Sequence, residues 1–546
     1  MKHLVALLAG ATAVSAQTPT REQALAFMKK SAEFYATRVS TGGGYHFTYA
    51  EDLSYGRSEH GEGPTQVEFQ REGTPIVGMA FLEAFDATGD KFYLEAARAA
   101  AHALVKGQLC SGGWDYFVEF DPVKRRDYAY RSDGNCSARR GVTNFDDNTT
   151  QGSLRLLMRV DRALGFADKA IHEAALFALD SILKAQYPNG AWPQRYREFP
   201  DMSGHTVKRA SYPDSWPRKW PGPNYEAHYT FNDNSILDTI DMYLEAARIY
   251  DQPKYRAAAE RGGGFILLAQ MPDPQPAWAQ QYDRDMHPAW ARIFEPPSVT
   301  GGESQSILQM LMVLYRETGD RKYLDPVPRA LDYLKRSVLP GRGEPPRRER
   351  EAGAWAGGGL RIPRFLELKT NKPLYITKGT RVSVKGQPSA LLDGYEISYD
   401  GSSVITHYGV VTSADRLDAI GREYQRLVKA DPANLRRPAK LHGLSPWEGR
   451  RVSKPAAAAV AKIIASADPR GVWLEDGYIG KSNRIVSVFA ARDMTLTIGG
   501  KSYPVKENQT IDLFEGSEPP KEKVFRSSTF ARNLVALSAF VGGATQ

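Results

Sequence analysis

The segment Asn144–Gln151, which reads NFDDNTTQ, opens a predicted helix and decides how the surrounding chain is interpreted. Apolar residues at helical spacing follow it in Leu154–Val160, as expected for an amphipathic helix. A second acidic turn, Thr230–Ser235 (TFNDNS), precedes the run Ile236–Tyr250 in the same way. Because Asp and Asn are favoured N-caps, one interpretation is helix capping alone. The other is that two acidic helix entrances converge on a cation and an anionic ligand.

The two helical runs belong to a longer repeat. Turn signals at Ala87–Asp90, Arg162–Gly165, Tyr250–Pro253 and Glu317–Asp320 separate pairs of predicted helices at intervals of about 75–85 residues. Pro75–Phe85 and Phe92–Leu104 form the first pair. Each pair buries one apolar stripe against its neighbours, so the repeat predicts a mainly α fold, an (α/α) toroid or barrel of helical hairpins that closes on itself.

Two predicted helices end in the same pattern. Gln108–Trp114 and Gln186–Trp192 both read QxxxGxW, in which the helix ends before a glycine and a large aromatic side chain follows. One interpretation is that Trp114 and Trp192 fill the joint between repeats. The other is that they bind substrate, because a flat indole ring matches the apolar face of a sugar.

Composition limits the classes of function. The basic, apolar start and the small residues Val14–Ala16 predict a signal peptide at residues 1–16, and therefore a secreted or periplasmic protein without a membrane span. The net charge of +8 suits an acidic polysaccharide or solubility alone, and no aromatic-basic signature of nucleic-acid binding is present. In an oxidising compartment Cys110 and Cys136 are expected to form a disulfide, with free thiols as the alternative.

Three irregular segments are candidates for the walls of a ligand site. Thr41–Glu68 is rich in glycine and tyrosine and predicts a surface loop facing a ligand. Glu198–His228 is rich in proline and tryptophan and predicts an ordered cleft wall. Arg292, in a proline-bounded loop, is suited to a bidentate carboxylate contact, and a salt bridge to Glu295 or Asp283 is the alternative. A fourth segment, Gly341–Gly359, has the composition of a mobile linker.

The character of the chain changes near residue 395. Leu360–Leu374 predicts an extended segment ending in a turn. Residues 396–546 predict a mixed helix and strand portion, separate from a toroid at residues 17–395. Its predicted elements are the helices Ser413–Lys429 and Lys454–Ser466, the strands Arg484–Ala490, Met494–Ile498 and Thr510–Phe514, a hairpin turn at Gly499-Gly500, and a last helix, Thr529–Phe540, that docks on the body.

Five segments, in their order along the chain, resemble those of pectate lyases of polysaccharide lyase family ten. They are Phe145–Gln151, Gln186–Gln194, Thr230–Asn234, Pro288–Arg292 and Arg364–Pro373, and the resemblance covers roughly residues 20–390. It implies an (α/α) toroid-like fold and cleavage of polygalacturonate by calcium-assisted β-elimination. A monomer acting on an acidic polysaccharide is therefore expected.

The resemblance also implies roles for individual residues. Metal and substrate ligands are placed at Asp146 or Asp147 and at Asp233, with Asp147 and Asp233 on the metal, Asp146 on the substrate and Asp233 also in the catalytic set. Arg364 is implied as the general base. Arg292 and Arg350 are implied as substrate-binding residues. Carboxylate oxygens are the hard ligands that calcium prefers, so these residue types agree with the chemistry.

Two other classes of function remain open at this stage. A hydrolase of unsaturated uronyl oligosaccharides would use Asp146 or Asp233 as a proton donor. A non-catalytic binder of acidic polysaccharide would use the tryptophans to stack on sugars.

Overall fold

The computed structural model describes residues 19–341, 359–376, 380–384, 390–391, 397–399, 411–438, 440–449, 453–479, 485–490, 492–498, 500–507, 509–514 and 521–542. The predicted signal peptide, residues 1–16, therefore lies outside the described residues. So do Arg350 and most of the predicted linker at 341–359. Within the described part, no helix is long and apolar enough to cross a membrane.

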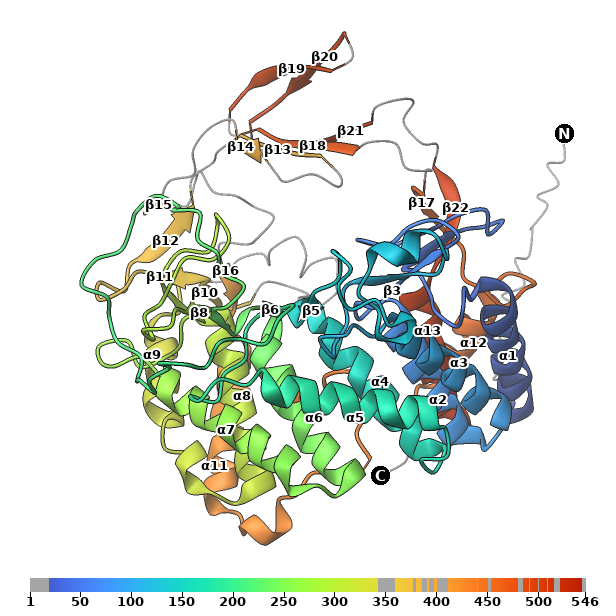
Figure 1. Ribbon diagram of the computed structural model, residues 1–546, viewed down its shortest axis with the longest axis horizontal. Coiled ribbons are helices and arrows are strands. Elements are labelled where there is room, and N and C mark those ends of the chain that lie inside the picture. Colours follow the sequence, from blue (N-terminus) through green and yellow to red (C-terminus); the bar gives the residue numbers. More distant parts are fainter. Residues whose placement is uncertain are drawn as a thin grey trace, which may run out of the picture.

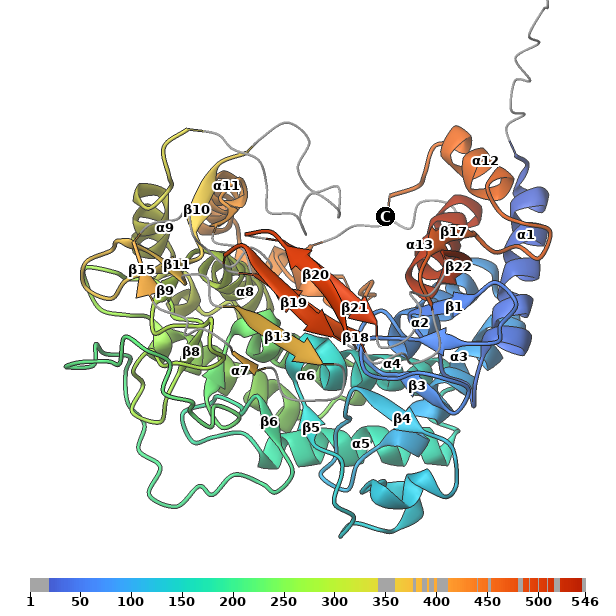
Figure 2. The same ribbon diagram turned by 90° about the horizontal axis from the view of Figure 1, so that it is seen from above.

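Four helical hairpins form the body of the molecule (Figure 1, Figure 2). They are α2 (Thr74–Thr88) with α3 (Lys91–Gly107), α4 (Thr149–Ala163) with α5 (Lys169–Lys184), α6 (Ser235–Tyr250) with α7 (Pro253–Ala269), and α8 (Gly301–Thr318) with α9 (Val327–Arg336). The first helix of each pair is buried over most of its length, whereas the second buries one face. The predicted (α/α) toroid of hairpins is confirmed.

The sequence specifies several of the helix boundaries directly. Asp90 and Asp168 accept hydrogen bonds from the first turns of α3 and α5, and proline is the first residue of α7. Thr20 and Gln23 form a reciprocal capping box at the start of α1 (Arg21–Phe34), which continues into a π-helical turn, Tyr35–Val39. These are the interactions that satisfy the free N–H groups of a helix start.

Helices from beyond residue 395 cover both ends of the row of hairpins. α13 (Ser527–Val541) packs on α2 and α1, and α11 (Arg416–Lys429) packs on α8 and α9. α12 (Ala457–Ala465) lies against α13 and α1. The predicted docking of the last helix is confirmed, and it covers one end of the row of hairpins. A domain boundary at residue 396 stays a prediction, since α11 and α13 are parts of the same helical body.

The segment 431–449 runs from α11 toward α12 across the inner helices. Ser445 Oγ and Trp447 Nε1 each donate to Asp238 Oδ1 on α6, both at 2.7 Å. Arg437 pairs with Asp241 on α6 and with Glu317 on α8, at 2.6 Å in each case. The ends of the chain are thus tied to the inner helices by buried polar contacts.

Short antiparallel strands connect the helices and form the rest of the chain. Those around the hairpins are β1 (Thr48–Ala50), β2 (Gly56–Arg57), β3 (Gln66–Glu68), β4 (Phe117–Glu119), β5 (Thr143–Asn144), β6 (Arg195–Tyr196), β7 (Tyr229–Thr230), β8 (Gln281–Tyr282) and β9 (Val299–Thr300). The pairs β3–β4, β5–β6 and β7–β8 each join two consecutive inter-hairpin connections near the entrances of inner helices.

The later strands form several small antiparallel sheets. β10 (Arg361–Pro363) pairs with β16 (Val411–Ser413), and β9, β11 (Phe365–Leu366), β12 (Pro373–Ile376) and β15 (Ile397–Ser398) form one sheet. A second sheet contains β14 (Ala390–Leu391), β13 (Arg381–Val384), β18 (Ile485–Phe489) and β21 (Thr510–Phe514), beside the hairpin of β19 (Met494–Ile498) and β20 (Lys501–Val505). β17 (Glu475–Gly477) and β22 (Glu522–Arg526) extend the β1–β2 sheet. The predicted C-terminal strands and hairpin are confirmed.

Trp114 and Trp192 are core residues, which corrects the prediction that they bind substrate. Both side chains are buried, and each indole Nε1 donates to a carbonyl of the helix before it, Leu104 O at 2.8 Å and Ile182 O at 3.0 Å. Trp278, which the QxxxGxW pattern misses, does the same to Ile266 O at 2.9 Å. Each ring fills the space behind a helix end, so neither face is open to a sugar.

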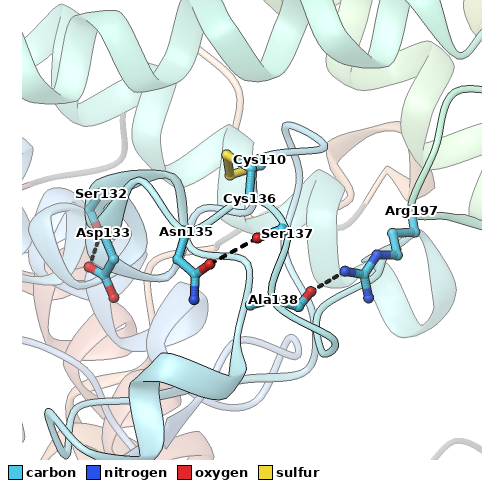
Figure 3. The surroundings of a disulfide bond; sticks show 8 residues. All are labelled: Cys110, Ser132, Asp133, Asn135, Cys136, Ser137, Ala138 and Arg197. Carbon is cyan, nitrogen blue, oxygen red and sulfur yellow. Dashed lines mark hydrogen bonds between the residues drawn. A yellow bond between two sulfur atoms is a disulfide. The ribbon is translucent and has the colours of Figure 1, made fainter.

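The predicted disulfide between Cys110 and Cys136 is confirmed. It closes the connection between α3 and β5, and Figure 3 shows the polar turns around it. Arg197, after β6, donates to the backbone carbonyl of Ala138 next to this loop. The bridge therefore fixes a loop that lies against the connection carrying β6.

Replacing Trp192 by alanine tests the structural role. We expect Trp192→Ala to lower the free energy of unfolding by about 3–5 kcal/mol, because a large cavity forms in a packed core. Chemical denaturation measures this change, with Phe199→Ala as control, since Phe199 is 46% exposed. A variant of unchanged stability with weakened substrate binding would restore the sugar-stacking interpretation.

Candidate active site with an acidic cluster

Two helix entrances of the same local construction supply the acidic residues. The 3₁₀ turns Asp146–Asn148 and Asn232–Asn234 lead directly into α4 and α6. In both turns an Asp and the following Asn are left-handed, with φ of 50° and 58° at Asp147-Asn148 and 48° and 60° at Asp233-Asn234. Asp and Asn tolerate this conformation better than most residues. Neither α4 nor α6 has a side-chain capping hydrogen bond, so the aspartates are not there as caps.

The two turns bring three carboxylates together. One oxygen from each of Asp146, Asp147 and Asp233 lies within 4.8 Å of the other two. Oxygen ligands 2.3–2.6 Å from a calcium ion lie at such separations from one another. Asp146 Oδ1 is buried and has no hydrogen-bond partner among the described residues. The hard-oxygen donor set and this unsatisfied atom fit a divalent cation.

Electrostatics in the cluster favour binding of a cation. Partial burial, followed by the charge of Asp146, raises the pKa of Asp147 to about 6. Partial burial, followed by Asp146 and Asp147, raises the pKa of Asp233 to about 7, although 42% of its side chain is open to solvent. The arginines Arg292 and Arg364 act in the opposite direction on Asp233. The cluster therefore holds more negative charge than its surroundings neutralise.

Tyr116 and Arg195 fix the buried carboxylate, and sequence analysis missed both. The Tyr116 hydroxyl and Arg195 Nη2 donate to Asp146 Oδ2 at 3.1 and 3.2 Å, and Arg195 Nη2 also donates to the Tyr116 oxygen at 2.7 Å. Arg195 Nε reaches Asn144 Oδ1 at 3.2 Å. Arg195 directly follows the segment Gln186–Gln194, and only the pairing of β6 with β5 brings it beside Asp146.

The predicted surface loop Thr41–Glu68 contributes to the same site. The ring of His60 stacks on Tyr116, with centroids 3.8 Å apart, and burial lowers the pKa of His60. Glu59 and Asp147 both accept from the Gln70 amide Nε2, at 3.5 and 2.9 Å. The loop therefore forms one wall beside the acidic cluster, and it contains β1 to β3.

Arg292 lies on the other side of Asp233. Its Nη2 is 3.7 Å from Asp233 Oδ2, while Glu295 holds the guanidinium through Nε and Nη2 at 2.9 and 2.7 Å. Of the two alternative partners, Glu295 is the one that pairs, and the contact positions Arg292 rather than removing it from the site. Trp220 of the Glu198–His228 insertion donates to Ala291 O at 2.9 Å, so that insertion supports the Arg292 loop.

Arg364 approaches from the chain between β10 and β11. Its Nη2 is 3.3 Å from Glu303 Oε1 at the start of α8. Glu367, three residues further along the chain, pairs with Arg218 and accepts from Tyr399. Glu303 also accepts from Gln280, whose amide donates to Asn232 next to Asp233. One hydrogen-bonded chain thus links Arg364 to the acidic turn.

The structure therefore brings most of the predicted site residues together from the three inter-hairpin connections and the segment after α9. They are Asp146, Asp147, Asp233, Arg292 and Arg364. Trp114 and Trp192 lie in the core, and Arg350 lies outside the described residues.

The comparisons with known proteins concern this same region. Residues 124–385 match the model of the family described as pectic acid lyase. This segment, a little under half of the chain, is similar to the pectic acid lyase family. It contains all five residues gathered at the site, and the match supports a polysaccharide lyase as the enzyme class. No protein in the curated set matches the chain.

Similar solved structures include several sugar-processing enzymes. An alanine mutant of a family 10 polysaccharide lyase from Cellvibrio cellulosa, in complex with trigalacturonic acid, is 17% identical with a TM-score of 0.41, over 65% of this chain and 98% of that one. A cellobiose 2-epimerase from Bacillus thermoamylovorans is 11% identical with a TM-score of 0.41, over 95% and 99%. The unsaturated glucuronyl hydrolase from Bacillus sp. GL1 is 13% identical with a TM-score of 0.33, over 59% and 69%.

Removing one carboxylate from the metal-free cluster tests the electrostatic argument. A folded-state pKa raised from the usual 3.8 to about 6 means that Asp147 costs stability as the pH rises through that range. In chelator at pH 8 we expect Asp147→Asn to raise the free energy of unfolding by roughly 1 kcal/mol, a small value because solvent screens the exposed group. Below about pH 4 the gain should vanish, because the carboxyl is protonated in both states.

Denaturation curves across this pH range measure the effect. Asp476→Asn is the control, because Asp476 is an exposed residue paired with Lys523 at 2.7 Å and its removal relieves no repulsion. A destabilised Asp147→Asn protein at pH 8 would show that the three carboxylates do not repel one another in the folded state.

Proposed function

We propose that the protein is a secreted or periplasmic pectate lyase, which cleaves polygalacturonate or a related polyuronate by calcium-assisted β-elimination. The observation that carries the proposal is the cluster of three carboxylates, Asp146, Asp147 and Asp233. Two arginines, Arg292 and Arg364, act on Asp233 from the other side of this cluster. A polyuronate has an anionic carboxylate next to the C5 proton that elimination removes. Cation-binding carboxylates beside guanidinium groups match that substrate.

Asp147 and Asp233 would hold the cation, with Asp146 as a third oxygen ligand or as the group that orients the other two. When bound, calcium supplies positive charge that neutralises the uronate carboxylate, acidifies the C5 proton and disfavours the protonated form of Arg364. Arg292 is held by Glu295. It binds the uronate carboxylate through the N–H groups on the edge of its guanidinium that lies toward Asp233. Its planar donors suit a bidentate contact.

Arg364 acts as the base in this scheme. It takes the C5 proton, the C–H electrons form the C4–C5 double bond, and the C4–O bond breaks with its electrons on the leaving oxygen. A guanidinium that must lose its proton first is an unusual base. Glu303 pairs with Arg364 directly. Glu303 is itself held by Gln280, whose amide also donates to Asn232.

A hydrolase of unsaturated uronyl oligosaccharides is the second candidate. The observation in its favour is Asp233, whose pKa of about 7 suits a proton donor at neutral pH. The two enzymes change ultraviolet absorbance in opposite directions, since one forms the double bond and the other consumes it. A protein that only binds acidic polysaccharide changes it in neither direction.

Incubation with polygalacturonate separates these candidates. We expect ultraviolet absorbance to rise with time in the presence of calcium, to stop rising in excess chelator, and to resume when calcium is added back. Asp233→Asn should remain inactive after calcium is restored, whereas the distant Asp476→Asn should match the parent. Full activity in excess chelator, with no divalent ion bound, would remove Asp147 and Asp233 from the metal role, and a fall in absorbance on unsaturated oligomers would favour the hydrolase.

Two arginine variants test the roles of base and substrate ligand. Arg364→Lys should lower kcat by roughly 10²–10⁴-fold, the share expected of general-base catalysis, with little change in stability. Arg292→Ala should act mainly by raising KM, because the carboxylate it binds is present in ground and transition states alike.

Steady-state kinetics on polygalacturonate measure both effects. Arg218→Lys is a matched control, since Arg218 is 53% exposed and pairs with Glu367 outside the acidic cluster. An Arg364→Lys enzyme within about threefold of the parent kcat, far short of a general-base share, would exclude Arg364 as the base.

A further inference from the structure

A pocket lies at the other end of the inner helices from the acidic cluster. It has a volume of about 540 Å³ and is formed where α6 ends and α7 begins, with contributions from α4, α8 and the segment 431–449. α6 starts directly after the Asp233 turn, and Arg248 in the pocket is near its last residue, Tyr250. At 1.5 Å per residue the pocket is roughly 20 Å from the acidic cluster.

Guanidinium groups dominate the lining of this pocket. Five arginines contribute to it, Arg162, Arg248, Arg256, Arg436 and Arg437. The carboxylates in the lining are those of Glu317 and Asp251, and Glu317 already pairs with both Arg248 and Arg437. Arg256 pairs with Glu260 at 2.8 Å, and Arg437 also pairs with Asp241. The positive charge that is not paired within the described residues is therefore that of Arg162 and Arg436.

Arg437 gives a more specific indication. Its side chain is 8% exposed, and its Nε and Nη1 pair with Glu317 and Asp241 at 2.6 Å. Its Nη2 is buried without a hydrogen-bond partner among the described residues. A buried guanidinium N–H that lacks an acceptor is costly. Arg437 therefore adds unsatisfied hydrogen-bonding capacity to the wall of the pocket.

A purely structural role explains part of this cluster. Arg248 donates to Glu317 and to Pro438 O, so together with Arg437 it holds the segment 431–449 on α6 and α8. Arg248 also complements the carbonyl end of α6. This role does not extend to Arg162 and Arg436, which are exposed at the pocket and have no ion-pair partner in the part of the chain that the structure describes.

The start of α7 adds to the positive potential. Gln252, at its N-cap position, lines the pocket and makes no side-chain capping hydrogen bond. A helix N-terminus favours an anion, and here it lies beside the arginines. The carbonyl end of α6 and the Asp251 carboxylate oppose it, so the guanidinium groups remain the main source of attraction.

We propose that this pocket binds a small multivalent oxyanion through Arg162, Arg436 and Arg437. Planar guanidinium groups recognise phosphate, sulfate and carboxylate oxygens by paired hydrogen bonds, so these three chemistries share the site. A short acidic oligosaccharide and an inorganic oxyanion are the two sources of such groups. The site is separate from the acidic cluster, and the proposal does not depend on the lyase activity.

Titration calorimetry with sodium sulfate, potassium phosphate and trigalacturonate, each at constant ionic strength in chloride buffer, tests the proposal. We expect binding of at least one of these anions at one site per chain, separate from the acidic cluster. Arg162→Ala with Arg436→Ala should weaken that binding about tenfold or more, because two charged contacts are lost. Both side chains are exposed at the pocket, so folding should be retained.

The control replaces two other exposed arginines, Arg422→Ala with Arg532→Ala, which make the same change in net charge on α11 and α13. It should bind as the parent does. Binding of sulfate and phosphate without trigalacturonate would identify inorganic oxyanions, and loss of one trigalacturonate site in the pocket variant would identify the sugar acid. Equal affinity in the pocket variant and the control, or no binding beyond chloride, would overturn the proposal.

Discussion

Repulsion among three carboxylates is the constraint around which the rest of the site is arranged. Asp146, Asp147 and Asp233 have oxygens within 4.8 Å of one another, and like charges at this distance are unfavourable without compensation. Apart from Glu59, the polar groups described around them are donors or cations: Tyr116, Arg195, Gln70, Asn232 and Arg292. The left-handed turns position the charges, and the surrounding donors limit their cost. A site of this kind is stable enough to fold and still retains affinity for a cation.

Much of the scaffold could be predicted from sequence because it depends on local patterns. The helical spacing of apolar residues and the turns between them gave the hairpins, and the C-terminal strands followed from alternation and glycine turns. The pairing of Cys110 with Cys136 was predicted from an expected oxidising compartment and from the place of both residues in one polar, loop-like insertion. The first acidic turn departed visibly from simple helix capping, because Asp146 and Asp147 stand where one carboxylate would be enough. The second turn was recognised because it repeats the same pattern.

The remaining parts of the site depend on contacts between distant segments. Arg195 reaches Asp146 only because β5 and β6 pair, and Glu303 was inconspicuous in sequence although it holds Arg364. The sequence pattern around Trp114 and Trp192 would be the same whether their indoles faced a sugar or the end of a helix. Their burial was decided by how neighbouring hairpins pack, and a single sequence has no signal for that.

The packing of α13 on α2 has a consequence for the order of folding. α2 is one of the first helices to be synthesised and α13 is the last, so their contact joins segments more than 400 residues apart. During synthesis α2 cannot pack on α13 until nearly the whole chain has been made. In the same way β1 cannot pair with β22 until then. Contacts of such sequence separation form late, because the loop between them must close first. The amino-terminal hairpin is thus completed by the last helix, and a nascent chain is a natural client for chaperones.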